Sequence, residues 1–268
     1  MTRVLRIGER ARQALARSGG KAAPLAAFAD GPYFDADGDL IWVGARLPAM
    51  HPRAVITAEA QPRGVALQLA KIPERGWTPS STQLDIAAAG RIFELTRALT
   101  AGDVPRGFGP VLAGGTPTFP LDLAEDRVQA LARAYASDEP ASVLAASIPL
   151  LGFGIGLTPS GDDLAGAALF GRRLLAPEQR AWADTAEQLA REIETRSHLV
   201  SAALFGDLVR GETFAPLHAI AEALAVDDHT AALTAARELV AIGHSSGWDM
   251  FTGLAIGITG RCAPGTSA

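Results

Sequence analysis

The sequence reads LTPSGDDL over residues 157–164 and HSSGWDM over residues 244–250. Both stretches carry the pattern Ser-Gly-x-Asp, and in both a glycine follows eight residues after the last aspartate, at Gly171 and Gly257. Ser-x-x-Asp is a capping-box pattern with Asp in place of Glu, so each stretch predicts a loop that turns into a helix N-terminus. A helix start beside glycine offers backbone N–H groups and a partial positive charge to an anion. Two such starts in one chain indicate a site.

The rest of the chain divides into two parts that differ in the spacing of their apolar residues. Between about residues 25 and 80, the apolar runs 40–43, 54–57 and 65–69 alternate with the turn segments 35–39 and 61–64, which predicts a small antiparallel sheet or barrel. The run 35–39 predicts a hairpin turn in preference to a calcium loop. The remainder predicts helices, at about 3–17, 81–100, 122–136, 139–149, 161–175, 177–195, 197–210, 213–225, 228–242 and 246–259. Because strands and helices are segregated, we predict an α+β fold, with a β-rich part over 1–80 and a helical domain over 81–268.

The composition narrows the class of protein. The 268 residues are 48% hydrophobic, with a net charge of −5 and a single cysteine, Cys262. An acidic balance argues against a nucleic-acid partner, and one cysteine forms neither an internal disulfide nor a thiolate metal cluster. No stretch reaches the ~18 apolar residues of a membrane span, and the basic, amphipathic start lacks the apolar core of a secretory signal. We therefore expect a cytoplasmic protein that does not act at a membrane.

The first helix start supplies most of the candidate ligand-binding groups. Gly154 and Gly156 permit a close backbone approach, Thr158 and Ser160 offer hydroxyls, and Gly161 opens the helix. Asp162 and Asp163 occupy the first helical turn, where an alternative role is only to complement the helix dipole. The stretch is not a P-loop, because no lysine follows, and no strand pair brackets it as a dinucleotide fingerprint requires.

Two adjacent aspartates complicate a simple phosphate site, because they repel anions. One of them could cap the helix, or both could hold a hard cation such as Mg²⁺ that bridges to phosphate. They could also accept hydrogen bonds from the NH₂ group of an amide or carbamoyl ligand. Asp163, Asp207 and Asp249 form a thin metal-ligand set, and no His/Cys spacing supports a transition metal. We therefore predict no cofactor, with Mg²⁺ as the alternative.

The second helix start and a third stretch add further candidates. His244 could act as acid or base, Ser245, Ser246 and Gly247 could bind substrate, and Trp248 is expected to pack. In the third stretch, TRSHLVSAALFG over residues 195–206, Ser201 shares a helix face with Ser197. Arg106, Arg196 and His198 are further possible anion contacts, although His198 is better explained as an exposed polar residue at a helix start. The predicted catalytic residues are His244, Asp163 and Asp249.

The stretches LGFGIGLTPSGDD at 151–163 and IGHSSGWDM at 242–250 resemble the family of the AllH-type subunit of oxamate carbamoyltransferase, from anaerobic purine (allantoin) catabolism. SAALFG at 201–206 is similar to the middle motif of that family. The resemblance covers most of the chain and implies carbamoyl transfer involving carbamoyl phosphate, oxamate or oxalurate, usually with two other subunits. It assigns no catalytic role to a numbered residue.

Three hypotheses follow, in decreasing order of support. The first is a carbamoyl-transferring enzyme or subunit, whose small substrate carries a phosphate or carboxylate. The second is a non-catalytic assembly subunit or homo-oligomer that uses the small-residue helices 161–175 and 246–259 as contact faces. The third is a metal-dependent hydrolase or phosphotransferase built on Asp162, Asp163 and Asp249.

Overall fold

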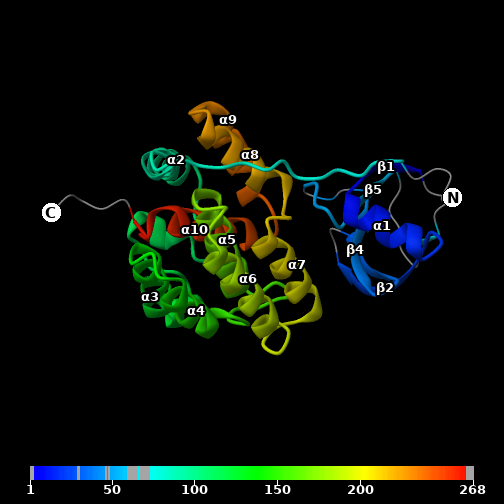
Figure 1. Ribbon diagram of the computed structural model, residues 1–268, viewed down its shortest axis with the longest axis horizontal. Helices are drawn as coiled ribbons and strands as arrows, with labels where there is room; N and C mark the ends of the chain where they lie inside the picture. Colours follow the sequence, from blue (N-terminus) through cyan, green and yellow to red (C-terminus); the bar gives the residue numbers. More distant parts are fainter. Residues whose placement is uncertain are drawn as a thin grey trace. The chain divides into compact units, whose positions relative to one another are not determined.

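The computed structural model describes residues 3–28, 31–45, 47, 49–58, 65–66 and 73–263. The chain divides into two compact units. The smaller unit comprises Met1–Ser80 together with Glu212–Ala215, and the larger comprises Ser81–Gly211 and Pro216–Ala268. Strands lie in the first and helices fill the second, which confirms the α+β class (Figure 1).

The smaller unit is built on one open sheet. Its strands are β1 (Val4–Ile7), β2 (Lys21–Phe28), β3 (Gly31–Ala36), β4 (Asp39–Gly44), β5 (Ala54–Thr57) and β6 (Val65–Ala66), in the order β1-β5-β4-β3-β2-β6. The pair β4·β5 is parallel and the other pairs are antiparallel, so the sheet is mixed rather than purely antiparallel. Helix α1 (Glu9–Arg17) buries Ala11, Ala14 and Leu15 in a core with Phe34 and Ile41.

In this unit one local expectation is confirmed and another is partly wrong. The run Asp35–Asp39 forms the turn between β3 and β4, with Asp37 and Gly38 both at positive φ, as expected for a hairpin. The helix expected over 3–17 is wrong in its first half, because Val4–Ile7 pairs with β5 as strand β1. A run of only four residues fits the helical period and the strand period equally well, so pairing with a distant strand decides which structure forms. Of the strand expected at 65–69, only Val65–Ala66 lies within the described residues, and the turn expected at 61–64 lies outside them.

The larger unit consists of helices joined by short loops. They are α2 (Ala88–Gly102), α3 (Glu125–Ala136), α4 (Pro140–Ser147), α5 (Ser160–Leu175), α6 (Arg180–Ile193), α7 (Leu199–Arg210), α8 (Ala215–Ala225), α9 (His229–Val240) and α10 (Ser246–Thr259), with 3₁₀ turns at Gly109–Ala113, Leu121–Ala124 and Ile148–Leu150. These bounds agree with the expected helices to within a few residues, except that α2 begins at Ala88 rather than near 81. None of the described helices is long and apolar enough to cross a membrane.

Helices α5 and α10 lie side by side in the middle of this unit (Figure 1). A Cβ atom at Gly253 would lie 2.1 Å from the carbonyl oxygen of Leu164, and one at Gly257 would lie 1.9 Å from that of Ala168. The contacts therefore advance by four residues in both helices together, so the helices run parallel. Glycine permits this backbone-to-backbone contact because it has no side chain to intervene.

Candidate functional site

The parallel packing brings the two Ser-Gly-x-Asp stretches together. The hydroxyls of Thr158 and Ser246 share a hydrogen bond of 3.1 Å, and those of Ser160 and Ser245 share one of 3.4 Å. Because both helices begin here and run in the same direction, the positive ends of their dipoles add. We call the residues Thr158, Ser160, Asp163, Ser245, Ser246 and Asp249 the start site.

The start-site serines do not cap their own helices, and the capping-box prediction is wrong in this respect. Ser160 and Ser246 are the first helical residues, and neither α5 nor α10 has a side-chain capping bond at its N-terminus. Their hydroxyls act across the pair instead. The hydroxyl of Ser246 on α10 is bonded to that of Thr158, which precedes α5, and the hydroxyl of Ser160 on α5 is bonded to that of Ser245, which precedes α10. A single stretch of sequence cannot reveal such a crossed arrangement.

A glycine at each helix start allows the helix to pack directly against the chain that precedes it. A Cβ atom at Gly161 would lie 2.0 Å from the carbonyl oxygen of Leu150, and one at Gly247 would lie 1.9 Å from that of Leu239. The N–H of Gly161 donates to Phe153 at 2.8 Å and that of Gly247 to Ile242 at 3.1 Å. These N–H groups are thus used within the chain, so both glycines position the site and are not the ligand donors we expected.

Asp162 and Ser201 also form hydrogen bonds within the chain. The Asp162 carboxylate accepts hydrogen bonds from the N–H of Gly152 at 2.6 Å and from the hydroxyl of Ser201 at 2.7 Å, and a third from the hydroxyl of Ser197. Burial nevertheless raises the pKa of Asp162, against the effect of these bonds. The carboxylate holds the glycine-rich loop against the start of α7. Because its oxygens are used in this way, Asp162 has little capacity left for the substrate-binding role that the sequence suggested.

Asp163 and Asp249 supply the carboxyl groups of the start site, and Asp163 is half-buried. Asp249 is fully buried, and its Oδ1 accepts the N–H of Phe108 at 2.7 Å. Gly107, at φ 57°, lies so close to this carboxyl that a Cβ atom would sit 2.2 Å from Oδ1. The Oδ2 atoms of Asp163 and Asp249 are buried, and neither has a hydrogen-bond partner among the described residues. This contact with residues 107–108 was missed, since their sequence shows only a Gly/Pro-rich loop.

The two carboxyl groups favour the protonated form. Burial raises the pKa of Asp249 to about 7, although the bond from Phe108 and the hydroxyls of Ser160 and Ser245 oppose the shift. Burial also raises the pKa of Asp163 well above its usual value, and the nearby charge of Asp249 raises it further. Two coupled carboxyls with raised pKa values are typical of sites that hold or transfer protons.

The rim of the start site is exposed. His244 is exposed, and its carbonyl oxygen accepts a 3.5 Å hydrogen bond from Nη1 of Arg106. Gly154 and Gly156 adopt φ of 123° and 101°, and Gly154 packs closely on the backbone nitrogen of Ser160. Trp248 is buried against Phe251, as expected for a packing residue. His244 and Arg106 are therefore within reach of a ligand, whereas Trp248 is not.

The described residues offer little support for a metal centre. They contain no group of three or more His, Cys, Asp or Glu residues that could hold a metal ion. Asp207 forms an ion pair with Arg210 at 2.9 Å, and the oxygens of Asp162 are occupied by hydrogen bonds. The thin metal-ligand set suggested by the sequence is not assembled.

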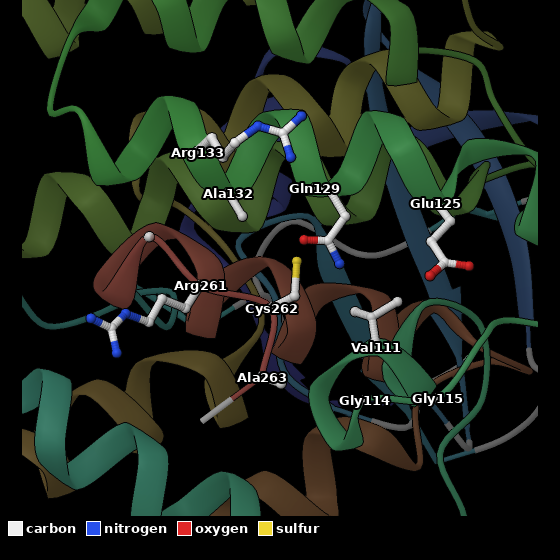
Figure 2. Close-up of a pocket in the computed structure, with 11 residues that line it drawn as sticks. Val111, Gly114, Gly115, Glu125, Gln129, Ala132, Arg133, Arg261, Cys262 and Ala263 are labelled. Carbon is white, nitrogen blue, oxygen red and sulfur yellow. The ribbon is translucent and has the colours of Figure 1, made fainter. Parts of the chain in front are cut away.

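A pocket of about 320 Å³ lies beyond the opposite end of α10 and contains no residue of the start site. In Figure 2 the sulfur of Cys262 points toward Gln129 of α3. Burial raises the pKa of the Cys262 thiol to about 11, so this cysteine is a poor nucleophile near neutral pH.

Comparison with known proteins supports the resemblance seen in the sequence. A family model described as oxamate carbamoyltransferase subunit AllH matches residues 150–258, from the loop before α5 almost to the end of α10. No curated protein and no solved structure matches the chain. The match includes both Ser-Gly-x-Asp stretches and the SAALFG stretch, but it covers less than half of the chain and not most of it as the sequence suggested. Over residues 150–258, this chain is similar to the AllH subunit family of oxamate carbamoyltransferase.

Proposed function

We propose that this chain is a subunit of a carbamoyltransferase and that it binds a carbamoyl-bearing substrate at the start site. The observation that carries the proposal is the meeting of two distant Ser-Gly-x-Asp stretches at the adjacent starts of α5 and α10. The family match, which suggests a role as an oxamate carbamoyltransferase subunit, includes both stretches. The site thus lies in the part of the chain that is similar to the family.

In the proposed reaction one bond forms, one bond breaks and one proton is transferred. When an amide nitrogen of oxamate attacks carbamoyl phosphate, a C–N bond forms, the C–O bond to phosphate breaks, and one N–H proton is transferred to the departing phosphate. The products are oxalurate and inorganic phosphate, and the reverse reaction yields carbamoyl phosphate. A carboxyl with a pKa of about 7 is suited to carry such a proton near neutral pH. Arg106 and His244 at the rim are available to the anionic ends of the substrates.

The assembly hypothesis has less support from the packing. Gly253 and Gly257 of α10 contact the backbone of α5, and Gly166 packs on Leu208 and Phe205 of α7. Gly171 likewise packs on Leu254 of α10. The small-residue faces that we considered as surfaces for a partner subunit are therefore used inside the larger unit.

The proposal is tested by the paired variant Ser160→Ala/Ser246→Ala. The chain, alone and together with the other subunits of the enzyme, is assayed for carbamoyl phosphate formation from oxalurate and phosphate, and ligand binding is measured by thermal shift. We expect carbamoyl phosphate or oxamate to raise the melting temperature of the wild type and not of the variant. Ser137→Ala is the matched control, because within the described part of the chain the Ser137 hydroxyl bonds only the backbone of α3. Unchanged turnover and binding in the paired variant would contradict a role for the start site.

A further inference from the structure

We propose that the pocket beyond the end of α10 binds a small molecule that has a cationic nitrogen at one end, a carboxylate at the other and a hydrocarbon chain between them. The pocket has a volume of about 320 Å³, and its lining includes Glu125, Gln129 and Arg133 of α3, Val111, and Cys262 after α10. We call it the α3 pocket. A cavity of this size suits a small molecule, and the inference goes beyond the proposed function because no start-site residue lines it.

The polar groups of the α3 pocket form a row along one face of α3. Glu125, Gln129 and Arg133 are spaced by four residues, which places their side chains next to one another on the helix surface. Figure 2 shows the carboxyl of Glu125, the amide of Gln129 and the guanidinium of Arg133 in this order along the helix. The α-carbons of Glu125 and Arg133 are about 12 Å apart along the helix axis. The row is therefore negative at one end, neutral in the middle and positive at the other end.

The two charged groups are not neutralised by each other or by a neighbour. Among the described residues, neither Glu125 nor Arg133 forms an ion pair or a side-chain hydrogen bond, although both line the same pocket. Arg172 on α5, by contrast, forms an ion pair with Asp138 at 3.0 Å. The guanidinium of Arg261 extends away from the row in Figure 2. The row thus offers a ligand one anionic and one cationic position.

The surface between the charged ends is apolar. Val111 and Ala132 are buried, and the 7% exposed Cys262 donates a weak hydrogen bond from its thiol to the carbonyl oxygen of Val128, at 3.9 Å. Burial raises the pKa of this thiol to about 11, the nearby charge of Arg133 lowers it and that of Glu125 raises it. The thiol is therefore neutral near pH 7 and lies close to both charged groups.

These features specify the class of ligand. A carboxylate pairs with the guanidinium of Arg133, an ammonium or guanidinium group pairs with the carboxyl of Glu125, and a hydrocarbon chain covers the apolar surface beside Cys262. An amino acid such as glycine carries its two charges on adjacent groups, so it cannot reach both ends of the row. A dicarboxylate would bring a like charge to Glu125, and a diamine would bring one to Arg133.

The test compares 6-aminohexanoate with three molecules that each lack one feature. Hexanoate lacks the ammonium group, 1-aminohexane lacks the carboxylate, and β-alanine has both charges on a shorter chain. Calorimetric titration of the full chain should give binding of 6-aminohexanoate at least about tenfold tighter than that of any of the three, because only this ligand makes both charge-assisted contacts. Titration with 4-guanidinobutanoate then shows which cationic nitrogen Glu125 prefers, and the same tenfold preference for either zwitterion supports the inference.

Two variants test the ends of the row separately. In Glu125→Gln, hexanoate should bind within about threefold of 6-aminohexanoate, whereas 1-aminohexane should still bind more weakly. Arg133→Gln should give the reverse pattern. Glu187→Gln and Arg191→Gln, both at exposed positions on α6, are the matched controls and should keep the preference of the wild type. A folding defect would weaken the binding of all ligands alike, so it would not produce this crossed pattern.

The single cysteine of the chain reports where the ligand binds. Because Cys262 is the only cysteine in the sequence, alkylation by iodoacetamide at alkaline pH marks the α3 pocket alone. We expect 6-aminohexanoate to slow this alkylation, with half of the effect at the concentration that half-saturates binding in calorimetry. Calorimetric binding without protection of Cys262 would place the ligand elsewhere and would overturn the inference.

The remaining outcomes are equally decisive. If neither zwitterion binds more tightly than hexanoate and 1-aminohexane, the α3 pocket does not read two separated charges. A wild-type pattern of preferences in Glu125→Gln or Arg133→Gln would also overturn the inference. Because the α3 pocket and the start site share no residue, these results leave the proposed function unaffected.

Discussion

Asp249 is the residue at which most parts of the site meet. It lies in the first turn of α10, accepts the Phe108 N–H, and lies in contact with Gly107. Its charge also raises the pKa of Asp163. Such a buried carboxyl is costly to ionise, because water no longer solvates the charge. The protein therefore keeps a carboxyl that lowers its stability near neutral pH.

The first prediction concerns the pH dependence of stability in Asp249→Asn. The folded-state pKa of Asp249 is about 7, and its ordinary value is 3.8. Between these values the folded chain holds a proton that the unfolded chain has lost, so the contribution of Asp249 to stability falls as pH rises from about 4 to about 7. The total change is on the order of 4 kcal/mol. We expect the variant to melt several degrees above the wild type at pH 8 and to converge with it near pH 4.

Asp184→Asn is the matched control for this measurement. Asp184 is exposed on α6, and among the described residues its side chain forms only a long ion pair, with Arg180. Its substitution should leave the difference from wild type nearly independent of pH over the same range. A constant offset in Asp249→Asn between pH 4 and pH 8 would show that Asp249 ionises as an ordinary carboxyl.

The second prediction concerns the positioning role of Asp162. Asp162→Ala removes the acceptor of the Gly152 N–H and of the Ser197 and Ser201 hydroxyls. Leaving these partly buried donors unpaired should lower the free energy of unfolding by about 2–4 kcal/mol, measured by urea denaturation. Asp162→Asn retains one acceptor oxygen at the same volume and should lose less. Equal stability of the alanine variant and the wild type would contradict this role.

At the scale of the elements, the parallel contact between α5 and α10 depends on glycine. We predict that Gly257→Ala strongly destabilises the larger unit, because the new Cβ atom would lie 1.9 Å from the carbonyl oxygen of Ala168. Gly90→Ala is the matched control, because Gly90 lies in α2 with no other group within 4 Å of its virtual Cβ. That substitution should raise the free energy of unfolding, by up to about 1 kcal/mol, through helix propensity. Similar melting temperatures for both variants would show that α5 and α10 can separate without cost.

The sequence predicts the helices well because their signals are local. Helical spacing and the Ser-Gly-x-Asp stretches place α5 and α10 to within a residue of their observed starts. Strand β1 is missed because its identity depends on pairing with β5, about fifty residues away. The start of α2 is placed too early, because the chain from Ser81 first passes Leu84, whose N–H bonds the carbonyl of Leu174.

The sequence selects the candidate residues of the site, but it does not show how they are arranged. Motif pattern and spacing select Thr158, Ser160, Ser245 and Ser246, whereas the pairing of their hydroxyls requires the starts of the two helices to meet. Gly107 and Phe108 give no chemical signal in the sequence, because they contribute through a backbone N–H and a close approach. Backbone groups of this kind become visible only once the chain is folded.

At the scale of the whole molecule, the family match and the strands occupy different parts of the chain. The matched residues 150–258 contain the start site, whereas strands β1–β6 end at Ala66. The chain also contributes to the smaller unit late in its sequence, through Glu212–Ala215. In that segment the N–H of Ala215 donates to the carbonyl of Met50 at 2.8 Å. The smaller unit is therefore not formed from the first 80 residues alone.

The last prediction tests that dependence with Phe214→Ala. The Phe214 ring packs edge-on against Trp42 of β4 at 6.2 Å between centroids and against His51 at 4.7 Å. Its removal from a site that is 7% exposed should cost about 3–5 kcal/mol and open the smaller unit locally. Hydrogen exchange followed by mass spectrometry should then be faster in peptides from β4 and β5 and unchanged in those from α5 and α10. Phe214→Leu, which retains most of the apolar volume, should have a smaller effect. Faster exchange in α5 and α10 as well would show that the two units unfold together, and unchanged exchange in β4 would show that Glu212–Ala215 does not stabilise the sheet.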